Sequence, residues 1–168
     1  EYVYEGELIV SAPRTHALAA SVRSDGTLAE PGEFQVSDSE QCNELGLFEC
    51  DSWGETPVQT VVGHDGVNYL VTWRQWMIPA GFLNYNHIVG ARVTPAGAVI
   101  DDPPINISGQ VAPSRARFNY RPAIAFDGAS YLVTWTSTDM TEVRILGART
   151  SPEGVVLDPD GISIATAG

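Results

Sequence analysis

A ten-residue stretch that occurs twice constrains the fold of this chain more than any other feature. Residues 64–73 read His-Asp-Gly-Val-Asn-Tyr-Leu-Val-Thr-Trp, and residues 126–135, 62 positions later, read Phe-Asp-Gly-Ala-Ser-Tyr-Leu-Val-Thr-Trp. Each copy ends in a β-branched and aromatic run, which is typical of a strand. The preceding Asp-Gly pair favours the positive φ angles of a tight two-residue turn. The repeat therefore predicts two β-hairpins with the same turn and the same second strand.

A second repeated spacing extends this pattern over most of the chain. In three places a small residue is followed seven positions later by a glycine, and eight positions after that by a large apolar residue. The three sets are Ala19, Gly26 and Phe34; Gly90, Gly97 and Ile105; and Gly147, Gly154 and Ile162. Short strands bounded by turn residues, without a helical period, predict an all-β fold of four-stranded antiparallel sheets, as in the blades of a propeller.

The repeated segments resemble the β-propeller-like repeats of large secreted bacterial proteins. The shared pattern is Asp-Gly-x-x-Tyr-Leu-Val-x-Trp, then Gly-Ala-Arg with Pro-x-Gly, then Ile-x-Ile. It occupies residues 65–73, 90–97 and 105–107, and again residues 127–135, 147–154 and 162–164. The resemblance implies propeller blades and a secreted location, extracellular or periplasmic. It implies no particular activity, because propellers carry many functions.

The pattern divides the chain into blades. Residues 1–37 are expected to form a partial blade that lacks its first strand, residues 57–108 a second blade and residues 109–168 a third, with an insertion at residues 38–56. A complete propeller has roughly four to eight blades, so these two and a half to three blades predict a larger closed assembly. We expect the missing blades to come from identical copies in a homo-oligomer, or from a second chain cut from the same precursor.

Both cysteines lie in the insertion. Seven residues, with two carboxylates and no histidine, separate Cys42 from Cys50. This interval favours a local disulfide over a metal site, and a disulfide would indicate an oxidising compartment. Two buried free thiols are the alternative.

The acidic composition argues against two classes of partner. The net charge is −12, which opposes binding to nucleic acid and to anionic membrane surfaces. No apolar run approaches the roughly 18 residues that span a bilayer, so we expect no membrane insertion. An acidic surface confers solubility and attracts cations.

Two acidic turns are the candidate cation ligands. Asp101 and Asp102 form one, and Asp158 and Asp160 form the other. Ca²⁺ prefers six to eight oxygen ligands, which neither turn visibly supplies. A solvated turn is therefore the alternative to a calcium site, and we expect no other cofactor.

Three aromatic residues have no counterpart in the other units. Trp76, Phe82 and Tyr85 fall in a segment, residues 74–86, that is predicted to be a long loop. Exposed, they would form a ligand-recognition surface. The alternative is a loop that folds back over the sheet.

The repeated aromatic and charged residues have simpler interpretations. Tyr69 and Trp73 are four residues apart, so both rings lie on one face of a strand, where they suit core packing between blades. The alternative for these rings and their repeats, Tyr131 and Trp135, is an aromatic platform that binds carbohydrate. Arg92 and its repeat Arg149 are expected to form ion pairs with turn carboxylates. Asp65 and its repeat are expected to serve the turn before glycine.

Catalysis has little support in the sequence. The three histidines, at positions 16, 64 and 87, have no metal-ligand spacing. No Gly-x-Ser-x-Gly elbow is present. We expect a non-enzymatic extracellular binding or assembly module. The alternative is one chain of a processed secreted hydrolase, acting on carbohydrate, with its site at the propeller axis.

Overall fold

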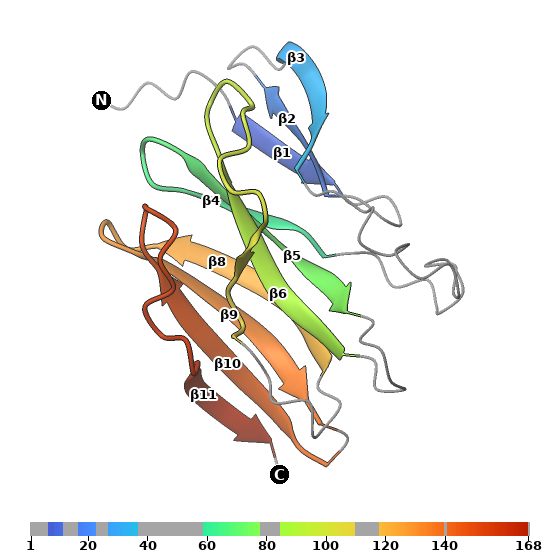
Figure 1. Ribbon diagram of the computed structural model, residues 1–168, viewed down its shortest axis with the longest axis vertical. Helices are drawn as coiled ribbons and strands as arrows, with labels where there is room; N and C mark the ends of the chain where they lie inside the picture. The colour runs from blue at the N-terminus through green and yellow to red at the C-terminus, as the bar shows by residue number, and fades with distance from the viewer. Residues whose placement is uncertain are drawn as a thin grey trace, which may run out of the picture.

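Three antiparallel sheets follow one another along the molecule (Figure 1). The computed structural model describes residues 7–11, 17–22, 27–36, 59–77, 85–109, 118–139 and 141–167. The first sheet contains β1 (Glu7–Ser11), β2 (Leu18–Val22) and β3 (Leu28–Gln35). The second contains β4 (Val61–His64), β5 (Tyr69–Met77), β6 (Tyr85–Val93) and β7 (Ile105–Asn106). The third contains β8 (Phe118–Phe126), β9 (Tyr131–Thr138), β10 (Val143–Thr150) and β11 (Ile162–Ala167).

The all-β fold with four-stranded antiparallel sheets is confirmed. Within each sheet the strands neighbour one another in chain order, and every described pair is antiparallel. The described part of the chain contains no helix, and accordingly no helix in it could cross a membrane.

The three sheets share one strand register. Each has a central residue, at the start of the repeated spacing, that pairs with one residue on either side. Ala19 pairs with Val10 and Phe34, Gly90 with Thr72 and Ile105, and Gly147 with Thr134 and Ile162. Strands β1, β2 and β3 therefore correspond to β5, β6 and β7, and to β9, β10 and β11. Among the described residues, the first sheet has no strand at the position of β4 and β8.

In the second and third sheets, a glycine at this central position leaves room for close packing on the face of the sheet. A Cβ on Gly90 would lie 2.9 Å from Ile107 Cδ1 and 3.0 Å from Thr72 Cγ2. A Cβ on Gly147 would lie 3.1 Å from Ile164 Cδ1. An isoleucine thus covers the space that the glycine leaves, directly after β7 for Ile107 and within β11 for Ile164, which explains why the two residue types recur together.

The Asp-Gly turn differs from the prediction. Of the two residues only Gly66 has a positive φ, 95°, so the turn residues are Gly66 and Val67, one position later than expected. Asp65 instead flanks the turn, where its Oδ1 accepts hydrogen bonds from the backbone N–H groups of Val67 and Asn68, both at 2.7 Å. Asp127 makes the same pair of bonds in the third sheet. The aspartate closes the turn with its side chain, as short polar residues often do.

The predicted loop at residues 74–86 is wrong at both ends. Strand β5 continues to Met77 and β6 begins at Tyr85, and these two residues pair with each other. Trp76 and Tyr85 therefore lie on strands, and Phe82 lies outside the described residues. Trp76 and Tyr85 are of residue types that favour strands, and strand pairing continues beyond the residues that repeat.

Strand β8 contains a proline, Pro122, and begins four residues before it, at Phe118. Proline lacks an amide hydrogen, and it marks the edge of a strand or a bulge. Here the chain passes it through a register shift between Tyr120 and Ala123, with Arg121 at a positive φ of 52°. The backbone N–H of Arg121 donates to Gln59 Oε1 at 2.5 Å, which ties the bulge to the second sheet.

Two apolar clusters form the core, and each lies between two sheets. The first contains Ala17, Ala19 and Val36 of the first sheet and its flanks, with Val71, Trp73, Val89, Ala91 and Val93 of the second. The other contains Leu70, Ile88 and Ile107 of the second sheet and its flank, with Tyr131, Val133, Trp135 and Ala148 of the third. The prediction that the repeated tryptophans pack in the core is confirmed, because Trp73 and Trp135 are 3% and 2% exposed.

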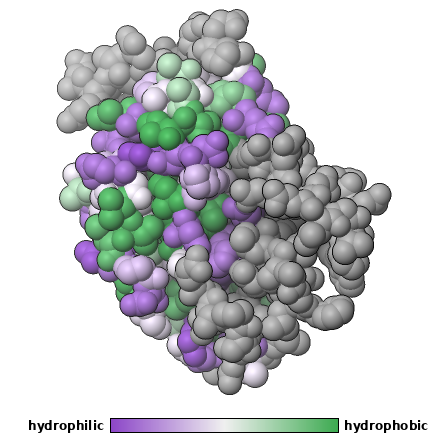
Figure 2. Space-filling model, viewed as in Figure 1, coloured by the Kyte–Doolittle hydropathy of each residue, from purple (hydrophilic) through white to green (hydrophobic). Residues whose placement is uncertain are grey.

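The third sheet covers the second, but among the described residues no sheet lies on its own far side. Leu70, Ile88 and Ile107 are each 0% exposed. Their counterparts in the repeat are Leu132, Ile145 and Ile164, which are 39%, 36% and 51% exposed. Hydrophobic residues reach the surface in patches between hydrophilic ones on the side of the molecule that Figure 2 shows. Identical positions thus differ in burial only because one sheet has a neighbour.

This difference predicts unequal costs for one substitution at two equivalent positions. Ile107→Ala should lower the free energy of unfolding by about 2–5 kcal/mol, because it leaves a cavity between two sheets. Ile164→Ala should cost at most about 1 kcal/mol, because much of its side chain already meets water. Urea unfolding followed by tryptophan fluorescence measures both. Equal costs would contradict the described arrangement.

Candidate functional site

A repeated arginine–aspartate pair is the most regular polar arrangement in the structure. Arg92, near the end of β6, binds Asp101 through Nε to Oδ2 at 2.9 Å and through Nη2 to Oδ1 at 2.8 Å. The backbone N–H of Arg92 donates to the same carboxylate at 2.8 Å. Arg149 and Asp158 repeat all three bonds at 2.9 Å. The predicted ion pairs of these arginines with turn carboxylates are confirmed.

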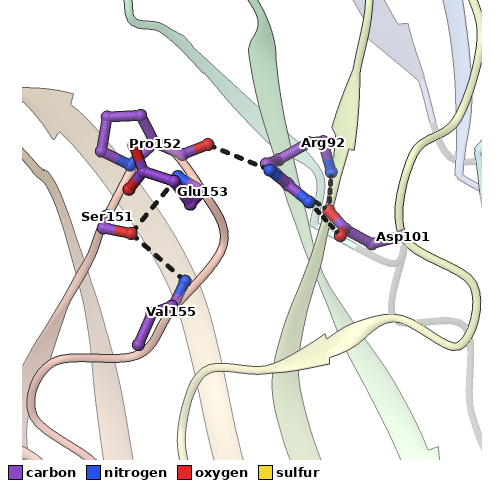
Figure 3. Close-up of polar contacts among 6 residues, drawn as sticks. All are labelled: Arg92, Asp101, Ser151, Pro152, Glu153 and Val155. Carbon is purple, nitrogen blue, oxygen red and sulfur yellow. Dashed lines mark hydrogen bonds and ion pairs between the residues drawn. The ribbon is translucent and has the colours of Figure 1, made fainter.

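Arg92 also joins the second sheet to the third (Figure 3). Its Nη1 donates to the carbonyl oxygen of Pro152 at 3.2 Å. Pro152 belongs to the turn at residues 151–154, which Ser151 holds by accepting N–H bonds from Glu153 and Val155. The pair with Asp101 fixes the guanidinium, so that its remaining edge faces the neighbouring turn.

The turn glycine is pressed against this arginine. A Cβ on Gly154 would lie 3.0 Å from Ile105 Cδ1 and 3.1 Å from Arg92 Nε. The equivalent glycine of the second sheet, Gly97, meets the first sheet in the same way, with its Cβ position 3.1 Å from Phe34 Cε1. Phe34 and Ile105 are counterparts in the repeat. The same contact therefore occurs at both interfaces between sheets.

A tyrosine adds a second polar link between the second and third sheets. Tyr131 is 0% exposed, and its hydroxyl donates to the backbone oxygen of Asn68 at 3.1 Å. Burial raises the pKa of Tyr131 above its usual range, and the nearby carboxylate of Asp65 raises it further. The phenol therefore stays protonated and keeps its donor role.

The ion pairs shift the pKa values of their members. The side-chain hydrogen bonds that Arg92 donates to Asp101 raise the pKa of Arg92. Burial acts to raise the pKa of Asp101, but the hydrogen bonds from Arg92 and its positive charge outweigh burial and lower it. In the more exposed pair, the hydrogen bonds from the Arg149 side chain and backbone lower the pKa of Asp158 to about 2.

The candidate calcium ligands are engaged in these pairs. Both oxygens of Asp101 and of Asp158 accept from arginine, whereas Asp102 and Asp160 are exposed at the surface. Within the described ranges, no group of three or more His, Cys, Asp or Glu side chains is arranged to hold a metal ion. Calcium binding stays a prediction, and a cation at Asp101 would have to displace Arg92.

Buried polar residues gather where β5, β6 and β8 end or begin. Asn86 Oδ1 accepts from the backbone N–H of Asn119 at 2.5 Å, and Asn119 Nδ2 donates to the backbone oxygen of Asn86 at 2.8 Å. Arg74, 3% exposed, lies over the ring of Tyr120, with Cζ 5.4 Å from its centroid, and burial lowers its pKa. This cluster orders the strand ends of two sheets. Sequence reasoning missed it because its residues do not repeat.

His87 belongs to the same region. Its Nδ1 lies 3.3 Å from Ser108 Oγ, and that hydroxyl also accepts from the backbone N–H of Ile88 at 3.1 Å. Burial lowers the pKa of His87, so the neutral imidazole is favoured. The histidine and the serine therefore fasten the end of β7 to β6.

Two of the unrepeated aromatic residues lie beside this cluster in the hairpin. Trp76 pairs with Asn86, and Tyr85 pairs with Met77, at the far end of β5 and β6 from the Asp-Gly turn. In the third sheet, β9 ends at Thr138 and β10 begins at Val143, so its hairpin is shorter. The pairing brings Trp76 and Tyr85 to the same end of the hairpin.

Cys42 and Cys50 lie outside the described residues, and their disulfide stays a prediction.

No family model and no curated protein sequence matches the chain. A solved structure of an α-L-arabinanase from Cellvibrio cellulosa, complexed with arabinohexaose, is similar with a TM-score of 0.48 and 13% identity. The alignment covers 92% of this chain and 53% of the arabinanase, so the chain spans about half the length of that protein. A similarity at this level carries no argument about fold or activity.

The Arg149–Asp158 pair predicts a pH dependence. The carboxyl of Asp158 should titrate near pH 2 in the folded protein, and its unfolded-state pKa is about 4. Because the folded pKa is the lower one, the stabilisation is complete above about pH 4 and is lost as the pH falls towards 2. Carbon-detected NMR of the aspartate carboxyls measures the midpoint.

Substitutions test whether Arg149 is the cause of the lowered pKa of Asp158. Arg149→Gln should raise the midpoint of Asp158 towards about 4. Arg144→Gln, which removes a different ion pair with Glu142, should leave it unchanged. A midpoint near 4 in the unmodified protein would show that the pair does not persist in solution.

Proposed function

We propose that this chain is part of a β-propeller that acts as an extracellular assembly and binding module, without catalytic activity of its own. The observation that carries this proposal is the repeated interface. Gly97 meets Phe34 between the first two sheets, and Gly154 meets Ile105, the counterpart of Phe34, between the next two. The two apolar clusters are likewise shared by successive sheets.

A repeated interface implies a repeated rotation. When each sheet meets the next through the same residues, each further sheet is rotated by the same angle relative to the one before it. The series then either closes as a ring or extends as a helix. Closure as a propeller typically takes roughly four to eight sheets. We therefore infer that further blades, from identical or different chains, complete the fold.

We assign the binding part of this function to the extended end of the β5–β6 hairpin. Trp76 and Tyr85 pair there with Asn86 and Met77, and the third sheet has no counterpart of these aromatic rings. Insertions on one end of a repeat are a usual place for binding residues. Phe82 belongs to the same segment. Carbohydrate is the ligand class that we expect, because flat aromatic side chains offer an apolar face to sugar rings.

Loss of one ring tests this assignment. Affinity electrophoresis against a panel of soluble polysaccharides gives a Kd from the retardation of the protein. Trp76→Ala should raise this Kd at least tenfold, a loss of about 1.4 kcal/mol of binding free energy. Val67→Ala is the control, because Val67 is an exposed apolar residue in the turn before β5, at the opposite end of the hairpin. Retardation that survives Trp76→Ala would exclude this end of the hairpin.

The assembly itself can be examined in protein purified from its natural source. Electron microscopy should show a ring of roughly four to eight sheets around an axis, and native mass spectrometry should identify the chains that contribute them. A two-layer sandwich, a filament or an isolated chain would contradict the proposal. A co-purifying chain with catalytic residues would favour the hydrolase alternative over a non-enzymatic module.

A further inference from the structure

We propose that the far side of the third sheet is a docking site for a complete four-stranded unit of the same repeat. We call this surface the open face, and it consists of Leu132, Ile145, Arg149, Ile162 and Ile164. The inference rests on the proposed assembly function and deepens it by naming the partner. The occupant brings its own Pro-x-Gly turn against Arg149 and its own first strand across β8, β9 and β10.

The apolar part of the open face has a covered counterpart within the same chain. Leu132, Ile145 and Ile164 correspond to Leu70, Ile88 and Ile107, all of which the third sheet buries completely. Ile162, 37% exposed, corresponds to Ile105, which contacts the glycine of the neighbouring turn. Several large apolar side chains exposed together on one sheet indicate an interface rather than an ordinary surface. The second interface of this chain therefore shows what covers such a face.

The polar part of the open face is prepared in the same way. Arg149 is held by Asp158 with the geometry that Asp101 imposes on Arg92. Arg92 Nη1 then donates to the carbonyl oxygen of Pro152. Among the described residues, Arg149 Nη1 has no such acceptor, and its side chain is 51% exposed against 19% for Arg92. A turn carbonyl from the next unit supplies the missing acceptor.

Two observations favour a complete repeat unit over a second copy of this chain. At the covered interface, β8 contacts β4, β5 and β6. β8 is the first strand of its sheet, and the described residues of the first sheet include no strand at that position. The described part of the first sheet of a second copy would therefore not supply the contacting strand. A net charge of −12 also opposes association between copies.

The turn of the occupant must carry glycine. At the covered interface, a Cβ on Gly154 would come within 3.0 Å of Ile105 and 3.1 Å of the guanidinium of Arg92. The open face presents the same isoleucine and arginine, as Ile162 and Arg149. The partner is thus defined by its chemistry: a sheet with a Pro-x-Gly turn and a buried Tyr-x-Val-x-Trp strand.

An extended chain tests the proposal, with a second copy of residues 109–168 appended after Gly168. In the original chain, Ile164→Ala should hardly change the urea midpoint of unfolding. In the extended chain, Ile164→Ala should lower the midpoint by as much as Ile107→Ala does in the original chain. The same substitution in the appended copy is the matched control and should again have little effect, because that copy has no sheet beyond it.

Amide hydrogen exchange provides a second measurement. Docking should slow exchange in β11 of the original unit at least tenfold, because its face becomes covered. Unchanged exchange together with a neutral Ile164→Ala would overturn the proposal. An appended copy that stays unfolded beside a folded first part would also overturn it, because an interface that fits the unit should stabilise it.

Self-association is a separate outcome. If the original chain forms dimers in sedimentation equilibrium and Ile164→Asp abolishes them, a second copy occupies the open face and the proposed partner is wrong. None of these results depends on whether the natural assembly is a propeller. Failure of the docking test and failure of the proposed function can therefore be told apart.

Discussion

Burial between neighbouring sheets is the interaction on which this structure depends. Strand β5 shows it most simply, because alternate side chains point to opposite faces of a strand. Val71 and Trp73 enter the cluster shared with the first sheet, and Leu70 enters the cluster shared with the third. Both faces of the second sheet are therefore apolar, and the sheet cannot bury either of them without a neighbouring sheet. Stability in such an arrangement is a sum of interface contributions between neighbours.

The polar contacts set the spacing of these layers. Asp101 orients Arg92, Arg92 reaches the carbonyl oxygen of Pro152, and Gly154 allows the turn to approach. Each step requires the preceding one, because a guanidinium that turned freely would lose its hold on the carbonyl. Most of the residues that recur with fixed spacing in the sequence belong to this set or to the core. Their regularity therefore reflects the contact between one sheet and the next, and it carries no information about a ligand.

The repeat was a good guide to strands and a poor guide to the places where the units differ. The positions of β5, β9 and β10 follow from the alternating β-branched and aromatic residues. The prediction placed the turn one residue too early, at Asp65 and Gly66. Asp65 instead precedes the turn, where its side chain accepts hydrogen bonds from the backbone N–H groups of Val67 and Asn68. The β5–β6 hairpin was predicted too short, since strand pairing continues beyond the repeated residues to Met77 and Tyr85. The buried pair of Asn86 and Asn119 had no signal in the sequence, because its two members lie 33 residues apart and neither repeats.

By itself, the sequence determined the class of fold, the shared register of the sheets and the pairing of Arg92 and Arg149 with turn carboxylates. These features depend on the spacing of residues within short segments, and such spacing can be read from strand propensity and from the alternation of side chains along a strand. Only the tertiary structure decided which copy of each repeated residue is buried. Ile107 and Ile164 occupy the same position in their units, yet one is 0% and the other 51% exposed. Exposure depends on whether another sheet lies against the strand, and that is a property of neighbours in space that no single unit encodes.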